Sequence, residues 1–133
     1  MVKKATTIML VDDEVDVLAV TKRMLENGGY AVHSFDNPEA ALHHVRNEGC
    51  RACILVVSDI RMPGMSGFDL VRRIKEVLPD LKVILTSSFV IHTDEFRKVM
   101  PSLHVDDFVR KPFTSSELLE AIKRFRQGLE GDG

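Results

Sequence analysis

The sequence lacks long apolar runs, basic clusters and any large excess of charge. No apolar run approaches the ~20 residues that a membrane-spanning helix requires, and the first residues lack a secretory pattern. The net charge is −2, from 18 Lys and Arg against 20 Asp and Glu, and no basic cluster is longer than Arg72-Arg73. These absences argue against a membrane-spanning protein, a secreted protein and a direct nucleic-acid partner. We expect a cytoplasmic protein.

Cysteine is also scarce, because the chain holds only Cys50 and Cys53, spaced as C-x-x-C. This spacing occurs in zinc sites and in redox motifs. His43 and His44 lie just upstream, but a structural zinc site needs four ligands within tetrahedral reach. Since Cys53 begins an apolar run, we expect one buried thiol and one thiol near the surface instead.

No internal repeat, linker or low-complexity stretch divides the 133 residues, a length that suits one domain. The hydrophobic fraction of 44% and the charged fraction of 29% are ordinary for a globular protein. We expect one domain over residues 1–127 and a flexible tail or truncated linker over 128–133.

Short apolar runs alternate with segments of helical periodicity along the whole chain. Three runs without polar alternation are expected to be strands covered on both faces of a parallel sheet: Ile8–Val11, Ile54–Val57 and Val83–Leu85. Ala31–Phe35 contains polar residues and is expected at an edge, and Phe108-Val109 would form the last strand. Strand and helix repeated five times predict an α/β fold, a doubly wound five-stranded parallel sheet flanked by five helices.

Helix-start and helix-stop signals separate these strands. Asn37 before Pro38 is an N-cap signal, and Thr114 with Glu117 forms a capping box. The other expected helices span residues 14–27, 66–78 and 93–100.

Polar residues follow the central strands at the points where these strands end. The first strand delivers Asp12 and Asp13, the third Asp59, the fourth Thr86 and the fifth Lys111. In an open α/β sheet, ligands bind beyond the carboxyl ends of the strands. Carboxylates suit Mg²⁺, an ammonium group can pair with a phosphoryl group, and a carboxylate can act as a nucleophile. Together these groups suit the formation of an acyl phosphate on an aspartate.

Four motifs lie in order along the chain: VDDE (11–14), SDIRMPGMSG (58–67), LTSS (85–88) and DDFVRKPF (106–113). With these motifs the chain resembles the receiver domain of two-component response regulators, whose architecture is flavodoxin-like (CheY-like). The likeness covers essentially the whole chain. It implies a phosphoacceptor switch in a two-component phosphorelay, with Mg²⁺ as cofactor.

The resemblance implies a role for each site residue. Asp59 would be the phosphoacceptor, and Lys111 would pair first with Asp59 and then with a phosphoryl oxygen. The carboxylates of Asp13 and Asp59 and the backbone carbonyl of Arg61 would bind Mg²⁺, while Asp12 would hold the ion mainly through water.

The resemblance also implies a switch formed by Thr86 and Phe108. The hydroxyl of Thr86 would move to the phosphoryl group, and the ring of Phe108 would turn inward into the vacated space. Simple core packing of Phe108 stays open as the alternative. A cis peptide bond is expected at Lys111–Pro112, because X-Pro bonds tolerate cis far better than other peptide bonds.

The implied partners are proteins. The phosphodonor would be a sensor histidine kinase or a histidine phosphotransfer protein, and an output domain or protein would bind the face of the fourth helix, fifth strand and fifth helix. Dimerisation on phosphorylation stays open. We expect self-phosphorylation and slow autodephosphorylation only, so the chain is not expected to be an enzyme.

Two features depart from the family pattern. More residues than usual separate Thr86 from Lys111, and the expected fourth helix is short and stops before Pro101, so we expect an atypical partner-binding face within 89–107. Arg61 lies two residues past Asp59, where its guanidinium could cover the phosphoryl group and hinder attacking water or could point to solvent.

Three other functions stay open from the sequence. A Mg²⁺-dependent phosphohydrolase of the haloacid dehalogenase type would form an aspartyl phosphate, but it needs an acid where this chain has Arg61. A flavodoxin-type flavin-binding module would place its phosphate against the acidic Asp12–Glu14 stretch. A degenerate receiver that acts only as an interaction module is disfavoured by the full set of site residues.

Overall fold

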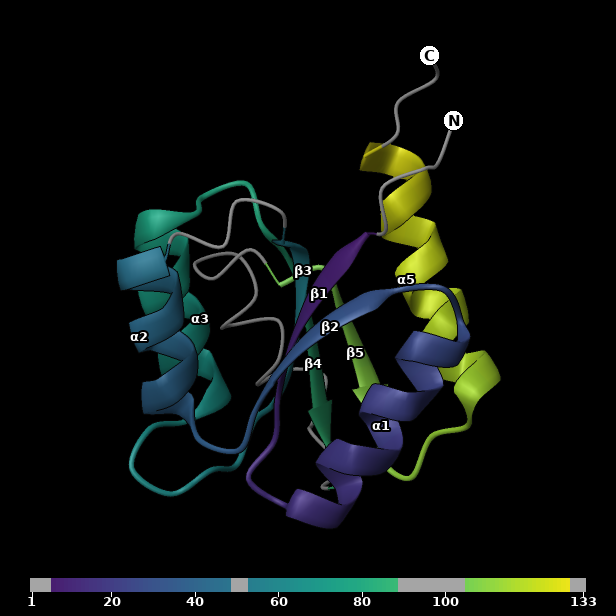
Figure 1. Ribbon diagram of the computed structural model, residues 1–133, viewed down its shortest axis with the longest axis horizontal. Coiled ribbons are helices and arrows are strands. Elements are labelled where there is room, and N and C mark those ends of the chain that lie inside the picture. The colour runs from purple at the N-terminus through teal and green to yellow at the C-terminus, as the bar shows by residue number, and fades with distance from the viewer. Residues whose placement is uncertain (1–5, 49–52, 89–104, 130–133) are drawn as a thin grey trace, which may run out of the picture.

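The computed structural model of the protein describes residues 6–48, 53–88 and 105–129 (Figure 1). Five parallel strands form one sheet in the order β2-β1-β3-β4-β5. The strands are β1 (Thr7–Val11), β2 (Ala31–Phe35), β3 (Cys53–Asp59), β4 (Lys82–Ser87) and β5 (Asp107–Arg110). The helices are α1 (Val15–Asn27), α2 (Pro38–Glu48), α3 (Gly67–Val77) and α5 (Ser115–Leu129).

The predicted α/β sheet is confirmed, with all five expected strands present and β2 at an edge. The described ranges hold four helices rather than the five expected. The expected helix over 93–100, and with it the atypical 89–104 stretch of the partner-binding face, lies outside the described residues.

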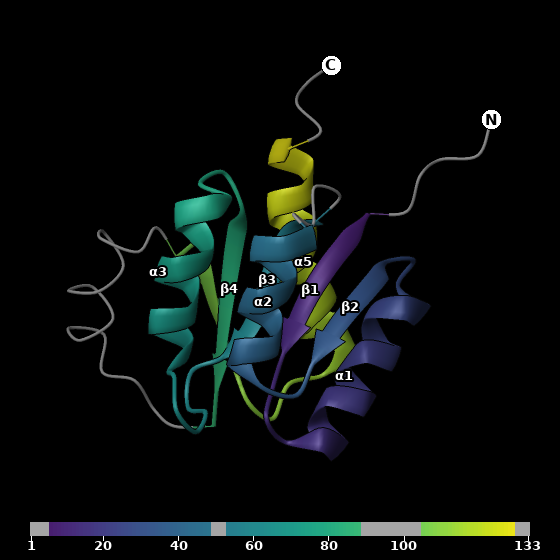
Figure 2. The same cartoon turned by 60° about the vertical axis from the view of Figure 1, so that its left-hand side comes forward.

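Helices cover both faces of the sheet, with α1 and α5 on one face and α2 and α3 on the other (Figures 1 and 2). This arrangement gives two apolar cores, because successive strand residues point to opposite faces. Met9 and Val11 of β1 pack toward α2 and α3, whereas Ile8 and Leu10 pack toward α1 and α5. All of β1 is buried, which explains its unbroken apolar sequence.

The predicted helix starts are formed by side-chain caps. The backbone N–H of Ala40 donates to Oδ1 of Asn37 at 2.8 Å, which begins α2. Thr114 and Glu117 form the expected capping box, with two reciprocal hydrogen bonds of 3.1 Å. These caps fix the helix starts at the carboxyl edge of the sheet, the lower edge in Figure 1.

Cys53, the first residue of β3, is buried and disulfide-bonded. The expectation of a free buried thiol at this position is therefore wrong, and Cys50 lies outside the described residues. No helix within the described ranges combines the length and the apolar character needed to cross a bilayer.

The connection from β3 to α3 leaves no room for a side chain at Gly67. A Cβ atom there would overlap the backbone oxygen of Asp59 and lie 2.9 Å from Cα of Ile60. The backbone N–H of Gly67 donates to the carbonyl of Ile60 at 2.7 Å. This close approach ties the start of α3 to the residue at which β3 ends.

We expect Gly67→Ala to lower the free energy of unfolding by roughly 2 kcal/mol or more, since the backbone of β3 or α3 must shift. The matched control is Gly29→Ala, where a Cβ atom meets no atom within 4 Å but φ is +96°. In that control, the free energy of unfolding should fall only by about 1–2 kcal/mol, the cost of a left-handed backbone conformation for a residue with a side chain. Urea unfolding measures both, and a loss at Gly67 no larger than at Gly29 would contradict the steric explanation.

Candidate functional site

One ammonium group touches three carboxylates at the carboxyl edge of the sheet. Nζ of Lys111 lies 2.6 Å from Oδ2 of Asp12 and 3.4 Å from Oδ2 of Asp59. The same atom lies 3.8 Å from Oε1 of Glu14. The side chains of Asp12, Asp59 and Lys111 are at most 10% exposed, whereas that of Glu14 is 60% exposed. The site therefore has a buried charged centre and one carboxylate at its rim.

Backbone hydrogen bonds hold these residues just beyond the strand ends. The N–H of Asp12 donates to the carbonyl of Phe35 at 3.1 Å, and the N–H of Lys111 donates to that of Ser87 at 2.8 Å. Asp59 is still within β3, where its neighbour on β4 is Thr86. The groups thus converge because adjacent parallel strands end at the same edge.

Each buried carboxylate has one oxygen on a backbone N–H and the other near the ammonium group. For Asp59, the N–H of Ile60 donates to Oδ1 at 2.9 Å, and Oδ2 faces Lys111. For Asp12, the N–H of Glu14 donates to Oδ1 at 2.9 Å, and Oδ2 accepts from Lys111. This pattern fixes the orientation of both carboxylates before any ligand arrives.

Burial and mutual repulsion make the charge on Asp59 unfavourable. Desolvation raises the pKa of Asp59, Lys111 lowers it, and Asp12 raises it further, so that the net pKa lies above its ordinary value. For Lys111, burial alone would lower the pKa, but the hydrogen bond and charge of Asp12 and the charge of Asp59 raise it. Lys111 therefore stays a cation, and Asp59 is a carboxylate that gains from further positive charge.

The structure brings Asp12, Asp59 and Lys111 together as predicted, and places the buried Thr86 beside Asp59. Among the described residues, the group of acidic side chains close enough to share a metal ion is Asp12, Glu14 and Asp59, with one oxygen each within 4.8 Å of the others. Asp13 is half-buried and is not part of that group. Glu14 was not predicted as a site residue from the sequence, although it directly follows Asp12 and Asp13.

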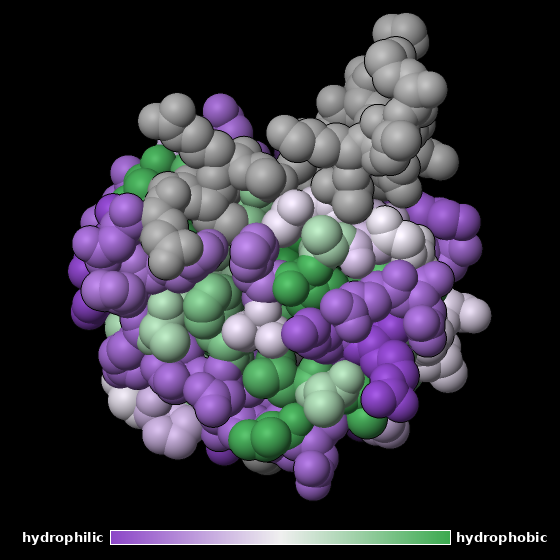
Figure 3. Space-filling view, in the orientation of Figure 1, coloured by the Kyte–Doolittle hydropathy of each residue, from purple (hydrophilic) through white to green (hydrophobic). Residues whose placement is uncertain are grey.

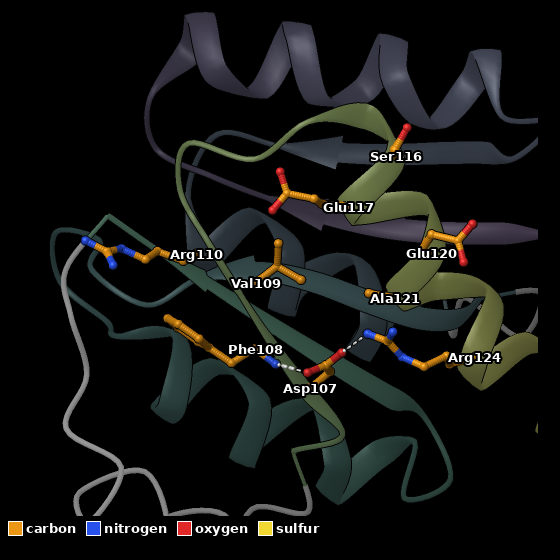
Figure 4. A pocket seen from close by; sticks show the side chains of 9 residues that line it. All are labelled: Asp107, Phe108, Val109, Arg110, Ser116, Glu117, Glu120, Ala121 and Arg124. Carbon is orange, nitrogen blue, oxygen red and sulfur yellow. Dashed lines mark hydrogen bonds and ion pairs between the residues drawn. The ribbon is translucent and has the colours of Figure 1, made fainter.

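The remaining expected residues lie around this centre. Phe108 on β5 is half-buried, packs against the core beneath α2 and α3, and points away from α5 (Figure 4). Its neighbour on β4 is Leu85. Arg61 is exposed in the loop after β3. The peptide bond Lys111–Pro112 is cis, as expected.

The donor set fits a hard divalent cation. Three carboxylate oxygens close together are the ligands that Mg²⁺ prefers, and Mg²⁺ is commonly held by a few carboxylates and water. The three carboxylates outnumber the single ammonium group, which leaves negative charge for the ion to neutralise.

The sequence profile of the response regulator receiver domain matches residues 8–123. The chain belongs to this family. It is 33% identical over 124 residues to the response regulator protein TodT of Pseudomonas putida, an alignment that covers 92% of this chain and 52% of TodT. It is also 32% identical over 120 residues to the C4-dicarboxylate transport transcriptional regulatory protein DctD of Rhizobium meliloti, covering 90% of this chain and 25% of DctD.

A CheY-like receiver domain protein from Methanospirillum hungatei has the same fold as this receiver. The two superpose with a TM-score of 0.86 at 27% identity, covering 98% of this chain and all of the other. The curated relatives are longer, because this receiver spans 25% of DctD and about half of TodT. It also matches 13% of the sensor kinase CckA of Brucella abortus, at 34% identity.

The raised pKa of Asp59 predicts that Asp59→Asn stabilises the ion-free receiver at pH 7. Because the folded-state pKa lies above the ordinary value of about 3.9, the native state favours the protonated form. That contribution is fully present below pH ~4 and is lost as the pH rises through the folded-state pKa. Removing the charge should therefore raise the free energy of unfolding at pH 7, and this gain should vanish toward pH 4.

Urea unfolding in EDTA at a series of pH values measures this effect. The exposed Asp80 supplies the control Asp80→Asn, which should shift stability little at any pH. An Asp59→Asn variant that is no more stable than wild type at pH 7 would show that the charge on Asp59 is not unfavourable.

Proposed function

We propose that this receiver is the phosphoacceptor switch of a two-component phosphorelay and is phosphorylated on Asp59. The observation that carries the proposal is the placement of Oδ2 of Asp59 3.4 Å from Nζ of Lys111, with Asp12 on the same ammonium group. A nucleophilic carboxylate thus lies beside a fixed cation that a phosphoryl oxygen can adopt as its partner. Receiver domains are signalling switches, and we propose that this one turns over no external metabolite.

The transfer uses groups that are already oriented. A carboxylate oxygen of Asp59 forms a bond to phosphorus while the P–N bond of a phosphohistidine breaks, and the electron pair leaves with the imidazole nitrogen. Lys111 stays charged at neutral pH and can donate a hydrogen bond to a phosphoryl oxygen. Mg²⁺, when bound, neutralises the carboxylates and the incoming phosphoryl group.

For the ion we propose carboxylate ligation by Asp13 and Asp59, the backbone carbonyl of Arg61, and water-mediated contact from Asp12. The buried Asp12 and Asp59 support this assignment, since their carboxylates lie close together with one oxygen each held by the backbone. Asp13 is included among the proposed ligands because of its position in the family motif. It is not part of the acidic group formed by Asp12, Glu14 and Asp59.

The proposed switch couples Thr86 to Phe108. Thr86 is buried and is the β4 neighbour of Asp59, which supports the proposal that its hydroxyl moves to a phosphoryl group on Asp59. Phe108 lies one strand further, beside Leu85. Converting a 1:99 population to 99:1 requires ~5.5 kcal/mol, which a few charge-assisted hydrogen bonds to a phosphoryl group can supply.

For the output partner we propose the surface of β5 and α5. A hollow between these elements is lined by side chains of both charge signs, and Asp107 reaches across it to Arg124 at 2.8 Å (Figure 4). Phe108 lies in the same stretch of β5, so a change in its position would alter this surface. Dimerisation on phosphorylation would use the same face.

For the phosphodonor, a histidine kinase or histidine phosphotransfer protein in the cytoplasm, we propose the surface beside the site. Val15 and Val20 of α1 are 63% and 55% exposed. Val20 and Phe113 line a hollow that also includes Lys111. Figure 3 shows hydrophobic atoms at the lower edge of the molecule, where α1 begins in Figure 1. A donor protein docked there would hold its histidine next to Asp59.

Acetyl phosphate with Mg²⁺ should add one phosphoryl group to the wild type, seen as a single mass increment in intact-protein mass spectrometry. Asp59→Asn should abolish the adduct, because the nucleophile is lost. Asp69→Asn, which changes a half-exposed acid of α3, should leave it intact. No adduct on the wild type, or an undiminished adduct on the Asp59→Asn variant, would refute the proposed function.

Arg61 should lengthen the lifetime of the phosphoryl group by covering it against attacking water. Arg61→Ala is expected to hydrolyse the acyl phosphate several-fold faster, roughly the effect of 1 kcal/mol on the barrier. The exposed Arg73 of α3 provides the control Arg73→Ala. Decay of the mass increment after removal of the donor measures both rates, and equal rates for wild type and Arg61→Ala would disprove shielding.

A further inference from the structure

Glu14 is the N-cap residue of α1, yet its side chain does not cap the helix. Ser, Thr, Asp and Asn are the preferred N-cap residues, and the longer Glu makes no side-chain cap hydrogen bond here. Its backbone N–H instead holds Oδ1 of Asp12, and its carboxylate turns to Lys111 at 3.8 Å. Helix capping therefore does not explain this residue, whereas the charged site does.

Glu14 is the exposed carboxylate of the charged site. Its side chain is 60% exposed, while those of Asp59 and Lys111 are at most 10% exposed. It lines the hollow that contains Val20, Lys111 and Phe113. An anion that approaches Lys111 through this hollow therefore meets the carboxylate of Glu14.

We propose that Glu14 is a specificity-determining residue that selects against free anionic phosphodonors in favour of a donor held by protein contacts. This inference rests on the proposed phosphorylation of Asp59. Glu14, Asp12 and Asp59 lie around one ammonium group, and the proposed ligand Asp13 adds a fourth carboxylate. With a divalent cation bound, these groups keep one net negative charge, which repels an anion, and neutralising Glu14 would remove that excess.

The two donor classes differ in how they overcome the rim charge. A small acyl phosphate gains only contacts made by its phosphoryl group, so repulsion by Glu14 lowers its rate directly. A docked donor protein gains apolar contact with residues such as Val20 and Phe113, which offsets the repulsion. The rim carboxylate therefore lowers unspecific phosphorylation more than phosphorylation by a docked partner.

The test compares Glu14→Gln with Asp16→Asn in the full chain at saturating Mg²⁺. Gln keeps the length of the side chain and removes only its charge. Asp16 lines the same hollow and is also exposed, so it controls for a general loss of negative charge. Phosphorylation rates are measured by mass spectrometry with acetyl phosphate, a dianion, and with phosphoramidate, which carries less negative charge, at low and high salt.

Glu14→Gln should raise the rate with acetyl phosphate roughly threefold to tenfold at low salt, with a smaller rise for phosphoramidate. The rise should shrink at ~0.5 M salt, because screening shortens the range of exposed charges. Asp16→Asn should change either rate less than twofold. Dependence on donor charge and salt distinguishes an electrostatic role from altered folding.

An unchanged or lower rate for Glu14→Gln would overturn the inference, and so would an equal rise for Asp16→Asn. These results differ from failure of the proposed function, in which the wild type itself would gain no phosphoryl group on Asp59. Phosphorylation of the wild type with no effect of Glu14 would leave the switch intact and remove only the selectivity.

Discussion

The contact of one buried ammonium group with several carboxylates is the interaction on which the site depends. Lys111 holds Asp12 at 2.6 Å and Asp59 at 3.4 Å, and it keeps its charge because these carboxylates raise its pKa despite burial. Without that cation, two nearly buried carboxylates would repel each other in a medium of low polarity. With it they remain close together, and the three carboxylates still outnumber the one ammonium group, as suits a site that could hold a divalent ion.

The fold supplies this contact through the geometry of parallel strands. Asp12 follows β1, Asp59 ends β3 and Lys111 follows β5, so residues distant in sequence meet at one edge. Two apolar cores fix the strands on both faces, and the backbone approach at Gly67 fixes the loop after Asp59. Rigid elements thus position a group of charges that would not stay together on flexible loops.

The five-stranded parallel sheet and the convergence of Asp12, Asp59 and Lys111 could be predicted from the sequence. Apolar runs and capping residues such as Asn37 indicate local structure directly. Polar residues that follow parallel strands can be assigned to the carboxyl edge of the sheet, because all the strands end there. Glu14 could not be predicted in the same way, because an exposed side chain can take several rotamers and only the tertiary structure shows it turned to Lys111. The expectation for Cys53 was wrong for a related reason, since burial does not decide whether a thiol is free.

The exposed and buried carboxylates have different consequences for a switch. Asp12 and Asp59 are both held by backbone N–H groups, and the raised pKa of Asp59 means that its charge weakens the folded structure when no divalent cation is bound. Glu14 is largely exposed, and its charge therefore costs little stability. It still acts on anything that enters from solvent, because an approaching anion meets its field before reaching the buried centre. Under the proposed function, an exposed residue such as Glu14 can thus change the preference for a phosphodonor without altering the buried groups around Asp59.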